Sequence, residues 1–194
     1  MKKQPTTIAF DLPDWIDGFC EAYQTTASHT ARMQFVINAA RENVARKTGG
    51  PFAAAIFRQD TGELVALGVN LVTSAGLSIL HAEMVAIAVA QTRIGHYDLG
   101  ADPAVHYELV TSTEPCSMCF GAIPWSGVRS VVTGAMDADA RRIGFDEGPK
   151  PDDWVGALTS RGIRVIEQVE RADAAQVLVD YLNQNGHIYN SREG

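Results

Sequence analysis

The sequence predicts an α/β protein, a three-layer α/β/α sandwich built around a mixed five-stranded sheet. Two observations lead to this fold. Segments with helical apolar spacing alternate with short apolar runs through the middle of the chain. Before that alternation, two strand-like runs flank a tight turn, which indicates a hairpin and therefore antiparallel strands in the same sheet. With 194 residues, 46% of them hydrophobic, the chain is large enough for one well-buried core.

The first thirty residues carry no clear signature, so we treat 1–30 as an N-terminal extension and 31–194 as the domain. Aromatic and aliphatic residues between positions 8 and 23 have roughly helical spacing, and they predict a short helix packed on the main body. A polar linker is expected after it. His29 ends that linker with no cysteine or acidic residue near it in the sequence, and we interpret it as a surface residue.

The domain alternates between predicted helices and predicted strands. In the first and last of the helices listed below, apolar residues recur every three or four positions, whereas the helix from His81 is apolar almost all round and is expected to be buried. The strands are short apolar runs bounded by glycine, proline or polar residues. The expected helices cover 31–47, 81–92, 116–123, 137–142, 152–161 and 174–186. The expected strands cover 52–57, 64–69, 107–112, 128–133 and 163–169, with a turn at 60–63 and a loop at 74–80.

Charge and cysteine content narrow the functional classes. The formal net charge of −7 argues against binding to nucleic acid, which needs clustered lysine and arginine, and favours a small uncharged substrate. Of three cysteines, two belong to one motif, so Cys20 is left without a disulfide partner. The chain starts without the apolar run of a signal peptide and has no window approaching the ~20 apolar residues of a membrane span. We therefore expect a cytoplasmic protein with no membrane partner.

Two short segments carry the chemistry. His81-Ala82-Glu83 and Pro115-Cys116-Ser117-Met118-Cys119 together form the pattern H-x-E…P-C-x-x-C. Zinc prefers imidazole and thiolate donors in a tetrahedron, so His81, Cys116 and Cys119 supply three ligands. A catalytic zinc site leaves its fourth position to water, and Glu83 is suited to carry protons beside that water. A structural zinc site and a redox C-x-x-C pair are the alternatives, because each half of the pattern is weak alone.

The spacing of the two cysteines supports their assignment as metal ligands. Three other polar segments are also considered as candidates for the site. The two cysteines are three residues apart at the start of a predicted helix, where the helix dipole favours thiolates. Glu114 is interpreted as a solvated loop residue rather than a catalytic carboxylate. Asp146-Glu147, between glycines, is either a charged surface turn or part of the site. Asn70, at a strand end, is either a turn residue or an amide that pairs with a heterocycle.

These motifs, with Gly121-Ala122-Ile123 after them, resemble the cytidine deaminase superfamily. More narrowly, the segment Phe120-Gly121-Ala122-Ile123-Pro124-Trp125-Ser126 and the segment Ile143-Gly144-Phe145-Asp146-Glu147-Gly148 are similar to bacterial guanine deaminases of that superfamily. The resemblance runs from about residue 50 to the tail.

The resemblance implies a zinc-dependent hydrolase that converts guanine to xanthine and ammonia. Zinc would be held by the three ligands named above, Glu83 would move a proton from water to the ring, and Glu147 would help the amine leave. Contacts to the purine are implied for Asn70, Phe52, Ala82, Trp125 and Tyr189. The family also implies a homodimer that exchanges C-terminal segments, in which Tyr189 closes the partner's site.

Three other functions share the same motif. Guanosine or an amino-triazine such as ammeline carries the same amine-bearing ring edge as guanine. A deaminase of tRNA adenosine or cytidine also shares the motif, although the acidic composition and the lack of a basic run in the last helix oppose it. A zinc-stabilised interaction domain without enzymatic activity is the third.

Overall fold

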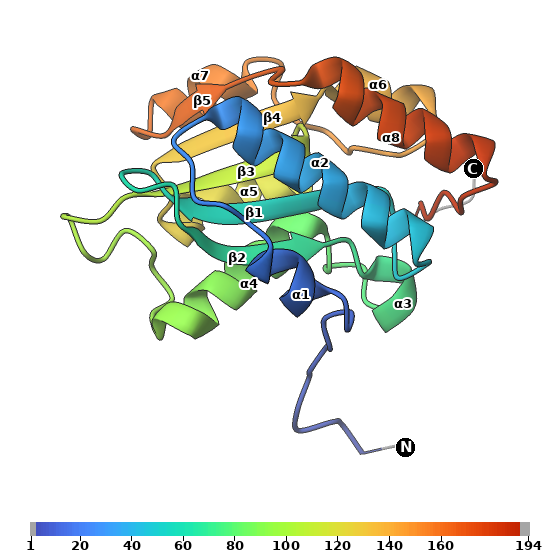
Figure 1. Cartoon of the computed structure of the whole chain (residues 1–194), viewed down its shortest axis with the longest axis horizontal. Coiled ribbons are helices and arrows are strands. Elements are labelled where there is room, and N and C mark those ends of the chain that lie inside the picture. The colour runs from blue at the N-terminus through green and yellow to red at the C-terminus, as the bar shows by residue number, and fades with distance from the viewer. Residues whose placement is uncertain (1–2, 191–194) are drawn as a thin grey trace.

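The computed structural model describes residues 3–190, and it shows the predicted sheet with helices on both faces (Figure 1). The strand order is β2-β1-β3-β4-β5. β1 is antiparallel to β2 and β3, whereas β3, β4 and β5 run parallel, so the sheet is mixed. The strands are β1 (Ala53–Arg58), β2 (Leu64–Val69), β3 (Tyr107–Thr113), β4 (Ser130–Ala135) and β5 (Arg164–Ile166).

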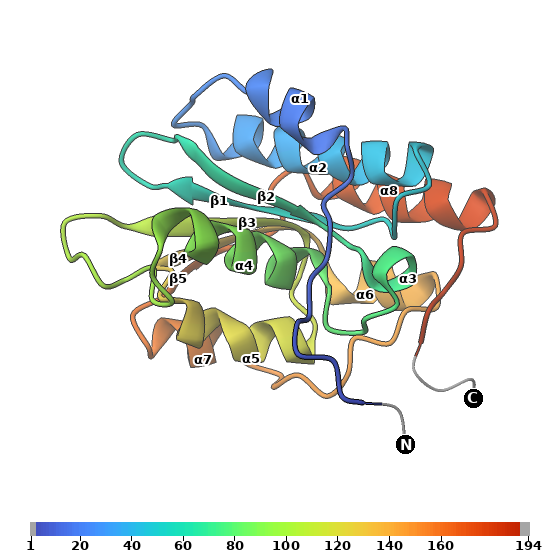
Figure 2. The same ribbon diagram turned by 90° about the horizontal axis from the view of Figure 1, so that it is seen from below.

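Helices cover the sheet in two layers, which the second view separates clearly (Figure 2). One layer contains α2 (His29–Ala45) and α8 (Arg171–Asn183), with the short α1 (Ile16–Glu21) beside them. The other layer contains α4 (Ala82–Ile94), α5 (Ser117–Ser126) and α7 (Trp154–Thr159). Two single-turn or short helices, α3 (Val72–Ala75) and α6 (Asp137–Arg142), lie at the end of the sheet where β2, β3 and β4 finish.

Each face of the sheet has its own hydrophobic core, because successive side chains of a strand point to opposite faces. Val110 and Val132 belong to the core under α2 and α8. Their neighbours Leu109 and Val131 belong to the core under α4, α5 and α7. All four side chains are fully buried. The sheet is thus buried on both sides, which explains why its central strands are continuous apolar runs.

The short helix expected near the N-terminus is present as α1, and it packs on the main body. Ile16 is 4% exposed and belongs to the first core, while the Trp15 indole donates a hydrogen bond to Thr48 at 3.1 Å. The ring of Tyr23 lies 5.5 Å from that of Phe57 in β1. Much of the predicted extension is therefore part of the folded unit.

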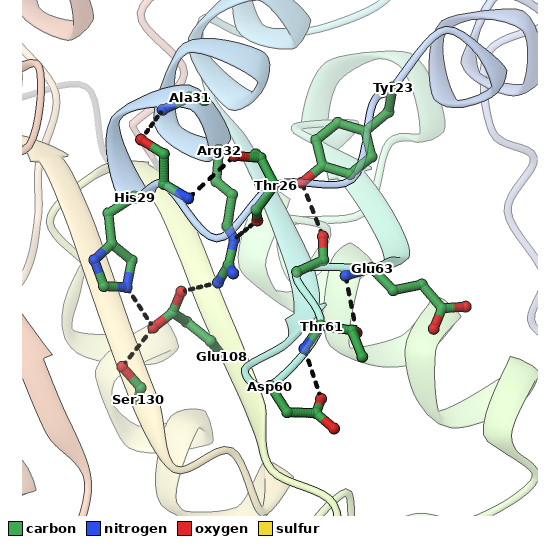
Figure 3. A network of polar contacts seen from close by, with 12 residues as sticks. Tyr23, Thr26, His29, Ala31, Arg32, Asp60, Thr61, Glu63, Glu108 and Ser130 are labelled. Carbon is green, nitrogen blue, oxygen red and sulfur yellow. Dashed lines mark hydrogen bonds and ion pairs between the residues drawn. The ribbon is translucent and has the colours of Figure 1, made fainter.

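His29 is half-exposed, which fits its interpretation as a surface residue, but in the folded chain it does have an acidic partner (Figure 3). His29 lies 3.2 Å from the carboxylate of Glu108, which is fully buried near the start of β3. The same carboxylate accepts hydrogen bonds from Arg32 at 2.9 Å and from Ser130 at 2.8 Å. The partner is 79 residues away in the chain, so sequence proximity could not reveal it.

Other differences from prediction lie at element ends. α5 continues through Pro124 to Ser126, beyond the expected end at 123, and Gly127 ends it in a left-handed conformation. β5 keeps only three of seven predicted residues, because it pairs with β4 alone, over three positions at the sheet edge. The short α3 lies just before and into the expected loop at 74–80.

The topology brings the chemical residues to one edge. β2 and β3 are both antiparallel to β1, so they run in the same direction and end at the same side of the sheet. Asn70 follows β2 and Glu114 follows β3. His81 and Cys116 are the N-cap residues of α4 and α5, which start at this edge. Active sites of α/β sheets lie at the carboxyl ends of their parallel strands for the same reason.

Candidate active site

The three predicted zinc ligands converge although Cys116 lies 35 residues from His81. One ligand atom from each of His81, Cys116 and Cys119 lies within 4.8 Å of the others. The Cys116 Sγ is 3.4 Å from the His81 Nδ1. No fourth histidine, cysteine or carboxylate joins this group within residues 3–190. One imidazole and two thiols on one side, with no fourth protein donor, is the donor set of a catalytic zinc site.

The local electrostatics suit thiolate ligands. A hydrogen bond from the Cys119 thiol, with another from His81, lowers the pKa of Cys116 to about 4 against the effect of burial. The hydrogen bond to Cys116, together with burial and the nearby Glu83, raises the pKa of Cys119 well above its usual value. Since a metal ligand must be deprotonated, metal binding at Cys119 releases a proton.

A cavity of about 330 Å³ opens beside the ligands, at the low end of the range for small-molecule sites. It is lined by four carboxylates, Glu83, Glu114, Asp146 and Glu147, and by residues of the C-terminal tail. Such a volume accommodates a single base and not a folded nucleic acid.

Two of these carboxylates lack a cationic partner. Glu83 is 7% exposed, and its carboxylate is 3.4 Å from the Cys119 Sγ. Glu147 is also 7% exposed, and its side chain makes no hydrogen bond within the described part of the chain. Burial raises the pKa of Glu83, and burial raises the pKa of Glu147 to about 8, with further increases from Cys116 and Glu83. Glu147 can therefore exchange protons near neutral pH.

The predicted purine contacts Asn70, Phe52 and Ala82 all line the cavity. Asn70 is 1% exposed, and its Oδ1 accepts a hydrogen bond from the Val72 amide at 3.2 Å. This bond confirms that Asn70 is a turn residue, and its place in the cavity lining is compatible with a contact to the substrate, which stays a prediction. Ala82 is the first residue of α4, where backbone amides have no partner inside the helix.

The aromatic wall includes a residue outside the predicted set. The Phe52 and Phe145 rings meet edge to face at 5.0 Å, and the Phe145 and Tyr189 rings do the same at 4.9 Å. Phe145 was quoted in the resemblance but not assigned to the pocket. The signal was available, because Phe145 is the aromatic residue directly before the two loop carboxylates.

Tyr189 lies in the cavity of its own chain. Its hydroxyl is buried and has no hydrogen-bond partner among the described residues, and burial raises its pKa well above the usual value. The tail is held by Asn190, which donates to the Gly144 carbonyl and accepts from the Asp146 amide, each at 2.9 Å. Gly50 makes room for the ring, because an added Cβ would lie 2.3 Å from the Tyr189 hydroxyl.

Two sequence interpretations need correction. Trp125 does not line the cavity and is 85% exposed near the end of α5, so it is no pocket wall within one chain. Glu114 is not solvated: it is 5% exposed and pairs with Lys150 at 3.2 Å. Both errors arise because neighbours in space, and not the local pattern, set the exposure of a side chain at an element end.

Comparison with known proteins agrees with this site. A family model for the cytidine and deoxycytidylate deaminase zinc-binding region matches residues 26–135. The chain therefore belongs to this family of zinc-dependent deaminases, and His81, Cys116 and Cys119 are positioned to hold its zinc ion. No helix in the described range combines the length and hydrophobicity that a bilayer crossing requires.

Within that family the chain is similar to guanine deaminases. It is 38% identical to the guanine deaminase of Bacillus subtilis over 120 residues, which cover 62% of this chain and 72% of that protein. The solved guanine deaminase from Nitrosomonas europaea is 42% identical, with a TM-score of 0.87 over 93% of this chain and 98% of that chain. The structure of NE0047 in complex with 2,6-diaminopurine is 45% identical, with a TM-score of 0.88 over 95% and 97%.

Proposed function

We propose that this deaminase hydrolyses guanine to xanthine and ammonia. The observation that carries the proposal is one small cavity in which a three-ligand zinc site meets two buried carboxylates, Glu83 and Glu147, without cationic partners. The similarity to guanine deaminases supports the choice of base, and so does the aminopurine bound by NE0047.

The two carboxylates divide the proton transfers. When bound, zinc supplies a water that is acidic enough to react at neutral pH. Glu83, next to the ligand Cys119, accepts a proton from that water and returns it to a ring nitrogen as the amine-bearing carbon becomes tetrahedral. Glu147, with its raised pKa, donates a proton to the exocyclic amine. The carbon–nitrogen bond then breaks to release ammonia, and the proton of the hydroxyl group on the same carbon passes to Glu147 as the carbonyl forms. A glutamic acid that stays protonated near pH 7 is the group that this second step needs.

The remaining cavity residues orient the base. Asn70 Nδ2 donates to an acceptor on the purine edge, and the amide of Ala82 offers a second donor at the start of α4. Phe52 and Tyr189 line the cavity and pack against the planar base, which gains stacking and dispersion energy from these aromatic rings. A free base is favoured over guanosine because the cavity, with Tyr189 in its lining, has a volume of only about 330 Å³.

We propose also that the protein acts as a cytoplasmic homodimer in purine metabolism. Trp125 at 85% exposure and Met118 at 36% lie on α5 next to the cavity, and such apolar exposure favours a protein partner. Exchange of C-terminal segments would form the contacts of Tyr189 and Asn190 between two chains instead of within one. Thiolate ligands at Cys116 and Cys119 favour a reducing compartment.

An ammonia-release screen of the zinc-loaded protein tests the substrate. The panel is guanine, guanosine, cytosine, cytidine, adenine and ammeline, with tRNA in a separate assay at moderate salt. Guanine is expected to react fastest by kcat/KM. Faster release from ammeline or guanosine would identify that compound as the substrate in place of guanine. Formation of inosine in tRNA would support the alternative function of a tRNA deaminase. No release of ammonia from any compound would favour the interaction domain without enzymatic activity.

Removal of zinc tests the metal. Dialysis against a chelator is expected to abolish ammonia release, and one equivalent of zinc is expected to restore it. Cys119→Ser should bind zinc weakly and stay inactive after the same treatment. Full activity in the metal-free protein would contradict the mechanism.

A further inference from the structure

The loop that carries Glu147 is attached to the loop that carries the zinc ligands through one side chain, Lys150. We propose that Lys150 is a positioning residue for the deamination, which holds Glu147 at its working distance from the metal site. This inference rests on the proposed function, because it assigns a cause to the placement of the second carboxylate.

Lys150 is a buried cation with contacts on three elements. Only 7% of its side chain is exposed. Its ammonium donates to the Glu114 carboxylate at 3.2 Å and to the Pro115 carbonyl at 3.1 Å, and it lies 4.9 Å from the centre of the Trp154 ring. Asp137 in α6 is 3.6 Å away. A lysine rarely gives up its hydration unless such partners replace the water.

The partners are the two residues directly before a zinc ligand. Glu114 and Pro115 precede Cys116, which caps α5. Lys150 itself stands three residues after Glu147, so the ammonium links the two loops across one short span. A backbone hydrogen bond from the Ser117 amide to the Glu147 carbonyl, 2.9 Å long, joins the same loops on the other side of Cys116.

Two side chains of the loop also support it, because Phe145 is buried in the core and the Asp146 carboxylate accepts a hydrogen bond from the Gly148 amide at 2.9 Å. Asp146 is exposed, and Gly148 has a positive φ of 68°, a conformation that flexible turns adopt. From outside the loop, Asn190 accepts a hydrogen bond from the Asp146 amide at 2.9 Å, and Arg141 donates to the Gly148 carbonyl at 2.8 Å, but 44% of the Arg141 side chain is exposed. A charged bond shielded from water is stronger than an exposed one, so Lys150 is the buried charged contact that holds this loop against the loop of the zinc ligands.

The position of Glu147 matters because proton transfer needs hydrogen-bond distance to the leaving amine. If the contact of Lys150 is lost, the Glu147 side chain can move away from the metal site, while the zinc ligands stay in place at the starts of α4 and α5. The expected defect is therefore in turnover, with little change in substrate binding or metal content.

The test compares Lys150→Met, which keeps the stem and removes the ammonium, with Arg142→Met. Arg142 lies on the neighbouring α6, pairs with Asp139 at 3.1 Å and has no recorded contact with the loop. Lys150→Met is expected to lower kcat by about 10- to 100-fold with KM changed by less than about threefold and zinc at one per chain, because misplacement of a reacting group has this size of effect. Arg142→Met should match the wild type, and Lys150→Arg should recover part of the lost turnover.

A second measurement does not depend on turnover. Hydrogen–deuterium exchange of the zinc-loaded protein should become faster over residues 144–151 in Lys150→Met, but not in Arg142→Met. If the wild type releases no ammonia from guanine, the proposed function fails while the exchange experiment still decides the role of Lys150. Unchanged exchange together with unchanged kcat would overturn the proposal, as would loss of zinc in proportion to activity.

Glu114→Gln covers the case in which Lys150→Met does not fold. The amide keeps the shape of the partner and removes its charge, so the loop should be held more weakly, and kcat should fall with zinc retained. In a double-mutant cycle with Lys150→Arg, the two effects are expected to be non-additive, because both act on one contact. Additive effects, or wild-type turnover in Glu114→Gln, would contradict the proposal.

Discussion

Two buried glutamates lie at opposite ends of strand β3, and a comparison of their surroundings distinguishes a structural ion pair from a catalytic site. Glu108 at the start of the strand accepts hydrogen bonds from Arg32 and Ser130 and lies against His29, so its charge is fully compensated (Figure 3). Glu114 directly after the strand is also paired, with Lys150. A buried ion pair alone therefore does not identify the site, since each end of the strand has one.

The difference lies in the carboxylates next to each pair. At the carboxyl end, Glu83 and Glu147 are buried beside the cavity without cations, and burial raises the pKa of both. No such group accompanies Glu108 among its contacts. A buried carboxyl group without a cation lowers the stability of the fold, and its shifted pKa makes it suited to proton transfer. The two carboxyl groups of this kind therefore identify the catalytic end of the strand.

The largest effect on activity is expected from Glu83→Gln. An amide cannot accept the proton from water, so kcat should fall by about 10²- to 10⁴-fold. Zinc content measured by atomic absorption should stay at one per chain, because Glu83 is no ligand. Loss of zinc in this variant would indicate that Glu83 is a zinc ligand and not the proton carrier.

Glu147→Gln is expected to come next, with kcat lower by about 10²-fold and zinc retained. Its control is Asp146→Asn, which removes the neighbouring charge from a side chain that is 69% exposed. Asp146→Asn should keep nearly full turnover in the same ammonia assay. Equal activity of both variants would reduce Glu147 to a loop residue.

A smaller effect is expected from Gly50→Ala, since the added methyl group would overlap the Tyr189 hydroxyl. Overpacking of this kind costs about 1–3 kcal/mol, which is expected to displace the tail and raise KM for guanine by about tenfold. Gly18→Ala is the matched control, because an added Cβ there meets nothing within 4 Å. Michaelis–Menten kinetics of the two variants measure the difference. An unchanged KM in Gly50→Ala would separate Tyr189 from substrate binding.

The smallest effect on activity is expected from Arg32→Met at the opposite end of β3. Breaking this buried pair should lower the free energy of unfolding by about 3 kcal/mol, because Glu108 loses its strongest partner. Turnover of the folded fraction should stay within about twofold of the wild type. Denaturant melts and kinetics below the transition check both statements. A large fall in kcat would show that the two ends are coupled.

Short-range chemistry made most of the fold and the metal centre predictable. Strand β2 and helix α6 have the bounds predicted from the sequence, and the zinc ligands are three residues with a fixed pattern of donors. Zinc selects its donors by chemistry, so His81, Cys116 and Cys119 could be assigned before their distance was known. The residues that the pattern misplaced, Trp125 and Glu114, sit where a helix or strand ends and other segments decide the exposure.

The amino-acid order was sufficient for the alternation of strands and helices and for the identity of the metal donors, because both depend on periodicity and ligand chemistry within a few residues. Pairings between distant segments were accessible only in three dimensions, as with His29 and Glu108 or Lys150 and Glu114. Their contact distances depend on how the sheet brings strand ends together, which is a property of the whole packed chain and not of any local pattern.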